Sequence, residues 1–194
     1  APDCVEKWLY TPSYALLNAS NGEIFRDDLG EFSKIRAEIK KGYPFDVRKK
    51  KIAACLALMA QSGQYNYMRC INRGEYGAAQ LAVFEFVKKG LSLVYLLNNA
   101  YEPFYKWVYK GLKNLNCLSE TGEVFSGLTE LGNSKKEAAE KYEIIEDVAA
   151  IIIEELIKQG LTKATCNNLE THAYSVQDGI KDIYLRNMHV MQGI

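Results

Sequence analysis

The stretch Tyr76–Asn98 has the sequence YGAAQLAVFEFVKKGLSLVYLLN, without a proline and with only three charged residues. Apolar residues recur at helical spacing in its first half and cover most sides of a helix in its second half. A helix that is apolar on most sides has to be buried against several neighbours. We therefore expect this helix to lie at the centre of a helical bundle.

Amphipathic helical patterns lie on both sides of this central stretch. Apolar residues at three- and four-residue spacing, interrupted by glycine, proline and turn-forming residues, mark them. The expected helices cover residues 31–42, 46–72, 103–112, 118–131, 135–159 and 169–186. Asp46 would cap the second of these, and Gly63 inside it would mark close packing or a kink. Because strands do not alternate with helices, we predict an all-α fold, an up-and-down helical bundle.

The first 30 residues have a different pattern from the rest of the chain. They mix short apolar runs with turn-forming residues and do not resemble a self-sufficient unit. Glu23–Arg26 is compatible with a strand, and Asp27–Gly30 with the turn of a small hairpin. We predict a connector or interface segment over residues 1–30 and a helical bundle domain over residues 31–194.

Composition excludes several classes of protein. Hydrophobic residues make up 48% of the 194 residues, which is enough for a sizeable core. Lys plus Arg and Asp plus Glu each number 24, so the basic excess typical of a nucleic-acid binder is missing. No apolar run reaches the ~18 residues of a membrane span, and no charged-then-apolar leader begins the chain. We expect neither a nucleic acid nor a membrane as partner.

The cysteines indicate a reducing compartment. Five of them are scattered through the chain, none forms a C-x-x-C motif, and only His172 and His189 could join them as ligands. This pattern argues against a disulfide framework and against a structural zinc site. We expect a cytoplasmic protein without a metal site in this chain.

A polar cluster interrupts the expected helix 46–72 near its end. Gln61, Tyr65, Arg69 and Arg73 are spaced four residues apart, so they would line one face of a helix. Each arginine carries a permanently charged, planar guanidinium group that can donate two hydrogen bonds to a phosphate or carboxylate group. The row predicts a site for an anion or polar ligand. A buried polar network, or a helix end in solvent, explains the row equally well.

A second polar cluster follows the central helix. Asn98, Tyr101, Tyr105 and Lys106 gather around the expected start of the next helix at Pro103. A helix N-terminus favours anions, and Lys106 would add a mobile cation for a phosphate group. The competing interpretation is a turn between helices whose tyrosines fill the core and keep their hydroxyls near water.

The chain lacks a self-contained catalytic motif. It has no glycine-rich phosphate loop, no G-x-S-x-G and no H-E-x-x-H sequence. The neighbouring carboxylates Asp27–Asp28 and Glu154–Glu155 would not converge on one point. Arg186 and His189 suit a helix C-terminus better than a nuclease centre. We therefore assign no catalytic residue.

Two long motifs contain both polar clusters. The first is Ala60–Tyr67 with Arg69–Cys70 and Arg73–Glu75, and the second is Leu96–Asn98 followed by Tyr101 and Pro103–Trp107. They resemble the helical domain of an uncharacterised bacterial family of polymerase-β-type nucleotidyltransferases, related to the kanamycin and lincosamide nucleotidyltransferases. In related enzymes the helical half closes over the nucleotide and shapes the acceptor site. The resemblance thus implies contacts to phosphate or acceptor from Arg69, Arg73, Tyr101, Tyr105 and Lys106.

The resemblance also implies a missing catalytic domain. Such transferases hold Mg²⁺ with an Asp-x-Asp pair that follows a Gly-Ser, and this sequence contains no such pair. Mg²⁺ and a nucleoside triphosphate are therefore implied for the full-length protein, with an N-terminal nucleotidyltransferase domain, in the same or a separate chain, as partner. These residues alone would not transfer nucleotides.

Two functions follow from these considerations. The first is the substrate- or nucleotide-binding helical domain of a nucleotidyltransferase. The alternative is a helical dimerisation or partner module of a separate transferase, similar to an antitoxin, which would use residues 1–30 to contact its partner.

Overall fold

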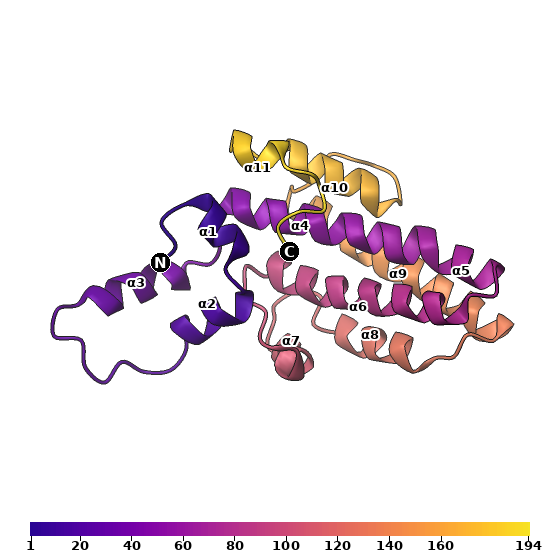
Figure 1. Ribbon diagram of the computed structural model, residues 1–194, viewed down its shortest axis with the longest axis horizontal. Helices are drawn as coiled ribbons and strands as arrows, with labels where there is room; N and C mark the ends of the chain where they lie inside the picture. The colour runs from indigo at the N-terminus through magenta and orange to yellow at the C-terminus, as the bar shows by residue number, and fades with distance from the viewer.

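The computed structural model describes residues 1–194 and consists of helices joined by turns and loops, without a β-strand (Figure 1). The elements are α1 (Val5–Tyr10), α2 (Ser13–Ser20), α3 (Glu31–Lys40), α4 (Phe45–Met59), η1 (Ala60–Tyr67), α5 (Met68–Asn72), α6 (Tyr76–Leu97), η2 (Tyr105–Trp107), α7 (Val108–Leu112), α8 (Thr121–Glu130), α9 (Lys135–Lys158), α10 (Leu169–Asp178) and α11 (Ile183–Asn187). The structure confirms the predicted all-α helical bundle. Every helix is too short or too polar to cross a membrane.

Helices α4 and α6 form the centre of the bundle, and the apolar pattern predicts this place for α6. Val83 and Phe86 of α6 and Ile52 of α4 are completely shielded from solvent. α4 packs against both α6 and α10, while α8 covers another side of α6 and contacts α9 (Figure 1). The two central helices therefore bring residues from distant parts of the sequence next to each other.

The long helix expected over residues 46–72 is present but changes its geometry in the middle. Residues Ala60–Tyr67 are π-helical and join α4 to α5. Gly63 lies at a close packing point, because a Cβ there would run into the ring of Phe86 and lie 3.0 Å from Cγ2 of Ile145. The wider π turn rotates the following residues relative to an ideal α-helix. Four-residue spacing therefore no longer marks one straight face.

Asp46 does not cap α4, contrary to the prediction. Its Oδ2 accepts hydrogen bonds from the backbone N–H groups of Lys181 and Asp182 at 3.1 and 2.8 Å. These two residues lie where the expected helix 169–186 is interrupted, so that α10 and α11 are separate. A contact across the bundle has replaced the local cap, because the free N–H groups of the interruption also need an acceptor.

The prediction of a small hairpin near the N-terminus is wrong. Residues 21–30 contain no strand and only a turn at Asp28–Leu29, and Oδ2 of Asp27 accepts a hydrogen bond from the backbone N–H of Ser33 at 2.7 Å. Gly30, with a φ of 69°, directly precedes α3. The turn-forming residues thus start a helix, because an aspartate satisfies the free N–H groups of a first helical turn.

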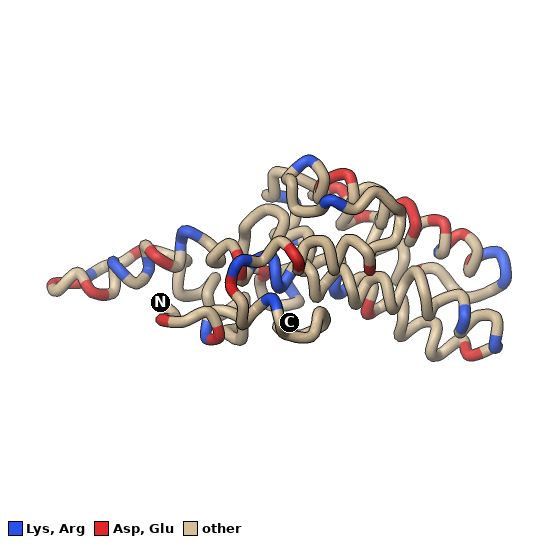
Figure 2. Tube along the Cα trace, turned by 90° about the horizontal axis from the view of Figure 1, so that it is seen from above, with Lys and Arg blue, Asp and Glu red and all other residues tan.

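Residues 1–40 are partly core and partly an arm. Trp8 and Leu9 of α1 are buried in the core. α2 and α3 extend beyond the bundle, and Figure 2 shows acidic and basic residues alternating along this arm. Buried Arg36 stabilises the arm by donating hydrogen bonds to the carbonyl oxygens of Ser20, at 3.0 Å, and Gly22.

Candidate functional site

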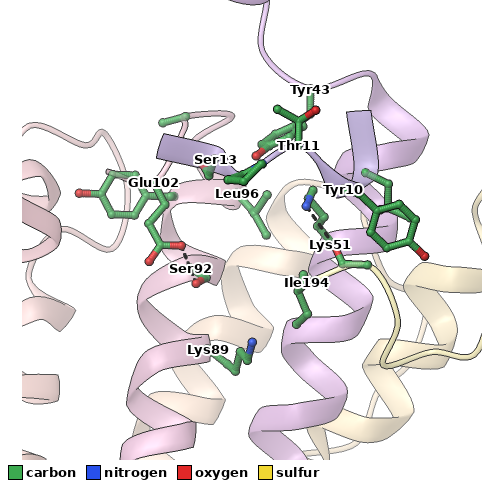
Figure 3. A pocket seen from close by; sticks show the side chains of 15 residues that line it. Tyr10, Thr11, Ser13, Tyr43, Lys51, Lys89, Ser92, Leu96, Glu102 and Ile194 are labelled. Atoms are coloured by element: carbon green, nitrogen blue, oxygen red, sulfur yellow. Dashed lines mark hydrogen bonds between the residues drawn. The ribbon is translucent and has the colours of Figure 1, made fainter. Parts of the chain in front are cut away.

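A cavity of about 330 Å³ lies where α4, α6, the α1–α2 connection and the last residues of the chain meet (Figure 3). Its volume falls in the lower part of the range of small-molecule sites, about 300–1,000 Å³. Its polar side chains come from widely separated parts of the sequence. They are Tyr10, Thr11, Ser13, Tyr43, Lys51, Lys89, Ser92, Tyr95 and Glu102. Two lysines and one carboxylate thus share one concave surface.

Lys51 reaches the cavity from α4. It is buried, its Nζ donates a hydrogen bond to the carbonyl oxygen of Gly193 at 3.0 Å, and Nζ lies 5.4 Å from the centre of the Tyr43 ring. Burial lowers the pKa of Lys51 from 10.5 to about 8. Lys51 takes part in none of the ion pairs of the chain. An anion in the cavity would therefore stabilise its charged form.

Helix α6 supplies Lys89 and Ser92, which lie one turn apart. Nζ of Lys89 is 3.9 Å from Oε1 of Glu85, and only 13% of the Lys89 side chain is exposed. Ser92 Oγ donates a hydrogen bond to Oε2 of Glu102 at 2.6 Å. Burial raises the pKa of Glu102, although the bond from Ser92 opposes the rise. Figure 3 shows the Glu102 carboxylate and the Lys51 amine on opposite sides of the cavity.

This arrangement can bind a ligand through charge. Two lysines and one carboxylate favour an anionic group such as a phosphate or carboxylate, with a hydroxyl or amine near Glu102. Cys55, one helical turn beyond Lys51, is completely buried, and burial raises its pKa to about 12, so it remains a thiol. No group of three His, Cys, Asp or Glu side chains is placed to hold a metal ion.

The first predicted cluster lies at the end of the bundle that α5 occupies. The side chains of Gln61, Tyr65, Arg69 and Arg73 are exposed. The Arg69 guanidinium lies 4.5 Å from the centre of the Tyr65 ring and donates a hydrogen bond to the Tyr65 hydroxyl. Arg69 and Tyr65 are thus in contact, but none of the four residues lines the cavity.

The second predicted cluster divides into structural and exposed residues. Asn98 donates to the carbonyl oxygens of Val94 and Cys117 and accepts from the N–H group of Cys117, so its amide joins α6 to the loop before α8. Tyr101 is buried and donates to the carbonyl oxygen of Ile39 at 2.7 Å. The polar atoms of both side chains therefore form hydrogen bonds with backbone groups of neighbouring segments.

The other two members of the second cluster face solvent. Tyr105 is 76% exposed. Lys106 is also exposed, and its Nζ lies 5.8 Å from the centre of the Trp107 ring. The helix start expected at Pro103 is replaced by η2 from Tyr105 and α7 from Val108. Neither Tyr105 nor Lys106 lines the cavity.

The structure does not bring the two clusters together. Arg73 precedes the first residue of α6, and Asn98 follows its last residue. A helix of 22 residues is ~33 Å long at 1.5 Å per residue. Arg69 and Arg73, for which the resemblance implies contacts to phosphate or acceptor, therefore do not share a pocket with Lys106 within this chain.

Sequence reasoning missed the charged residues of the cavity. Lys51 belongs to the basic run Arg48–Lys51, which looks like a solvated helix face, and Lys89 belongs to the central helix. Glu102 lies inside the second motif, between residues that we singled out. A charged residue within an otherwise apolar helical stripe was the available signal, because burying an unpaired lysine is costly.

A comparison with models of protein families matches residues 8–108 to a domain of unknown function, DUF4037. No curated protein and no solved structure matches the chain. The matched range covers just over half of the chain and contains Lys51, Lys89, Ser92 and Glu102. The chain therefore belongs to the family defined by this domain, DUF4037.

Proposed function

We propose that this chain is the substrate- or nucleotide-binding helical domain of a nucleotidyltransferase, and that the cavity at Lys51, Lys89 and Glu102 holds its anionic ligand. The observation that carries the proposal is the convergence of two largely buried lysines on one small cavity. The resemblance of the two motifs supports the class of enzyme, and the charges of the cavity support the chemistry of the ligand.

In this proposal Lys51 and Lys89 contact phosphate or carboxylate oxygens of the ligand, and Glu102 accepts a hydrogen bond from a hydroxyl or amine. Glu102 lies opposite the Lys51 amine, so one ligand would contact both (Figure 3). The metal ion and its carboxylate ligands belong to the separate nucleotidyltransferase domain, where Mg²⁺ would activate the nucleotide phosphates.

The arm formed by α2 and α3 supports the presence of a neighbouring domain. Phe25 is 95% exposed, Leu29 81% and Phe32 50%. Exposed apolar side chains that lie close together in sequence favour a contact with another protein surface. We propose the catalytic domain as this neighbour; a partner module of a separate transferase would use the same arm.

Calorimetry on the purified chain tests the ligand chemistry. ATP with Mg²⁺, and inorganic phosphate in a separate titration, serve as probes. Because hydrogen bonds to charged groups contribute about 1.5–3 kcal/mol, Lys51→Gln and Lys89→Gln should each weaken binding about tenfold or more. Arg69→Gln and Lys106→Gln are the matched controls, since both residues lie outside the cavity.

The pH dependence of binding provides a second readout. Affinity should fall as the pH rises through about 8, because Lys51 then loses its proton. The variant Lys51→Gln should lack this step. Wild-type affinity in both cavity variants would show that the ligand does not bind in the cavity. Loss of affinity only in the two control variants would show that the ligand binds at the residues of the sequence motifs instead.

A further inference from the structure

A second concave surface lies between α8 and α9, on residues that do not line the ligand cavity. This α8–α9 groove encloses about 670 Å³. Val124 and Ile151, each 39% exposed, belong to its apolar lining. Its charged residues are all acidic, namely Glu120, Glu130, Glu140 and Asp147. The groove therefore combines an apolar floor with a negatively charged rim.

The rim carboxylates have no cationic partner within the chain. None of the four takes part in an ion pair. From Glu120 to Ile157 the sequence contains ten acidic and three basic residues. The segment that forms the groove is therefore acidic, although the whole chain has no net charge. A partner suited to this side has to present apolar surface flanked by cations.

Gly127 leaves the groove open at the middle of α8. A Cβ at this position would meet nothing within 4 Å. A glycine inside a helix costs about 1 kcal/mol relative to alanine. No contact within the chain requires a glycine at this position, since no protein atom lies within 4 Å of the place where a Cβ would be. The bare backbone lets a bulky group from outside approach closely.

The same chain exposes a surface of complementary chemistry on η2 and α7. Trp107 is 51% exposed, and the Nζ atoms of Lys106 and Lys110 lie 5.8 and 5.4 Å from the centre of its ring. Lys113 follows on the next turn and is also exposed. None of these lysines takes part in an ion pair. A tryptophan flanked by cations matches an apolar groove with an acidic rim.

We propose that the α8–α9 groove is the docking site for Trp107 and its flanking lysines from a second copy of this chain. The indole ring enters the groove above Gly127, and Lys110 and Lys113 pair with the acidic rim. α7 and the start of α8 lie next to each other, since a Cβ at Gly122 would lie 3.1 Å from Cδ1 of Leu112. Two copies related by a two-fold axis can therefore make the same contact twice.

Sedimentation velocity over a range of protein concentrations tests this dimer. We expect a reversible dimer at low ionic strength that weakens towards about 0.5 M salt, where screening shortens the reach of charges to a few Å. Trp107→Ala removes the anchor, and Gly127→Leu fills the groove without entering the core. Each should raise the dimer dissociation constant about tenfold or more. The double variant Glu123→Lys/Glu154→Lys, outside the groove, should leave it unchanged.

Charge exchange identifies the two surfaces directly. The double variants Glu140→Lys/Asp147→Lys and Lys110→Glu/Lys113→Glu should each be monomeric, because each places like charges opposite each other. Their equimolar mixture should form a mixed dimer, which also shows that both variants fold. The proposal is overturned by a monomer at every concentration in low salt, by wild-type dimerisation of Trp107→Ala and Gly127→Leu, or by a mixture that stays monomeric.

Discussion

Two of the glycines that lie within helices occupy their positions for opposite physical reasons. At Gly63 the ring of Phe86 fills the space that a side chain would need, and Ile145 lies close by. At Gly127 the same space is empty. The first glycine permits the π-helical segment to pack against α6, and the second leaves a surface open. Spacing in the sequence does not distinguish the two cases.

The two glycines make a matched pair for a stability measurement. Gly63→Ala should lower the free energy of unfolding by about 1–3 kcal/mol, because Phe86 and Ile145 have to move. Gly127→Ala should raise it by up to about 1 kcal/mol, because helix propensity improves and nothing is displaced. Urea unfolding followed by circular dichroism measures both. Stabilisation by Gly63→Ala would contradict the close packing described here.

At the scale of elements, α4 uses its lysines to hold the last residues of the chain. Lys50 is fully buried, and its Nζ donates to Oε1 of Gln177 and to the carbonyl oxygens of His189 and Val190 at 2.9, 2.7 and 3.0 Å. Residues 188–194 form no helix that would satisfy these carbonyl groups. The amine of Lys50 therefore replaces the backbone donors of a regular element.

Removing this amine should loosen the last residues of the chain. Lys50→Met preserves length and apolar packing but leaves buried carbonyl groups without donors, at about 1–3 kcal/mol for each group. Hydrogen exchange of residues 188–194 should become faster, while that of α9 should not change. Lys40→Met, at an exposed position of α3, is the control. Unchanged protection of residues 188–194 in Lys50→Met would refute this role.

The whole molecule buries enough titratable groups to make its stability depend on alkaline pH. Burial lowers the pKa of Lys50 and Lys51 to about 8 and raises the pKa of Tyr43, Tyr67 and Tyr95 to about 12. In the unfolded chain these pKa values are about 10.4 for lysine and about 10 for tyrosine. From about pH 8 the unfolded lysines bind more protons than the folded ones, so stability rises with pH. Burial also raises the pKa of Cys55 to about 12, so above about pH 8.5 the unfolded thiol binds fewer protons and opposes this rise. Above about pH 10 the unfolded tyrosines bind fewer protons as well, so stability falls.

The free energy of unfolding should therefore pass through a maximum on the alkaline side of neutrality. Urea unfolding at a series of pH values should show a rise that begins near pH 8 and flattens above about pH 8.5, followed by a fall above about pH 10. Lys51→Met should reduce the rise and leave the fall unchanged. A stability that decreases steadily from pH 7 upward would show that the lysines are not desolvated as the structure indicates.

The apolar periodicity was sufficient to predict the class of fold, the longer helices and the central place of α6, but not α1, α2 or the interruption between α10 and α11. Burial of a regular stripe is a local property, since it depends on residues three and four apart. The polar residues were less informative. Asn98 and Tyr101 have the same chemistry whether they bind a ligand or a backbone carbonyl, and only their surroundings distinguish these roles.

The cavity at Lys51, Lys89 and Glu102 could not be predicted from the sequence. These residues belong to α4, α6 and the loop after α6, and they meet because the two central helices pack side by side. Arg73 and Lys106, in contrast, are kept apart by the length of α6. Residues far apart in the sequence come close together because the apolar stripes of different helices pack against each other. The spacing of residues within one helix does not determine how helices pack.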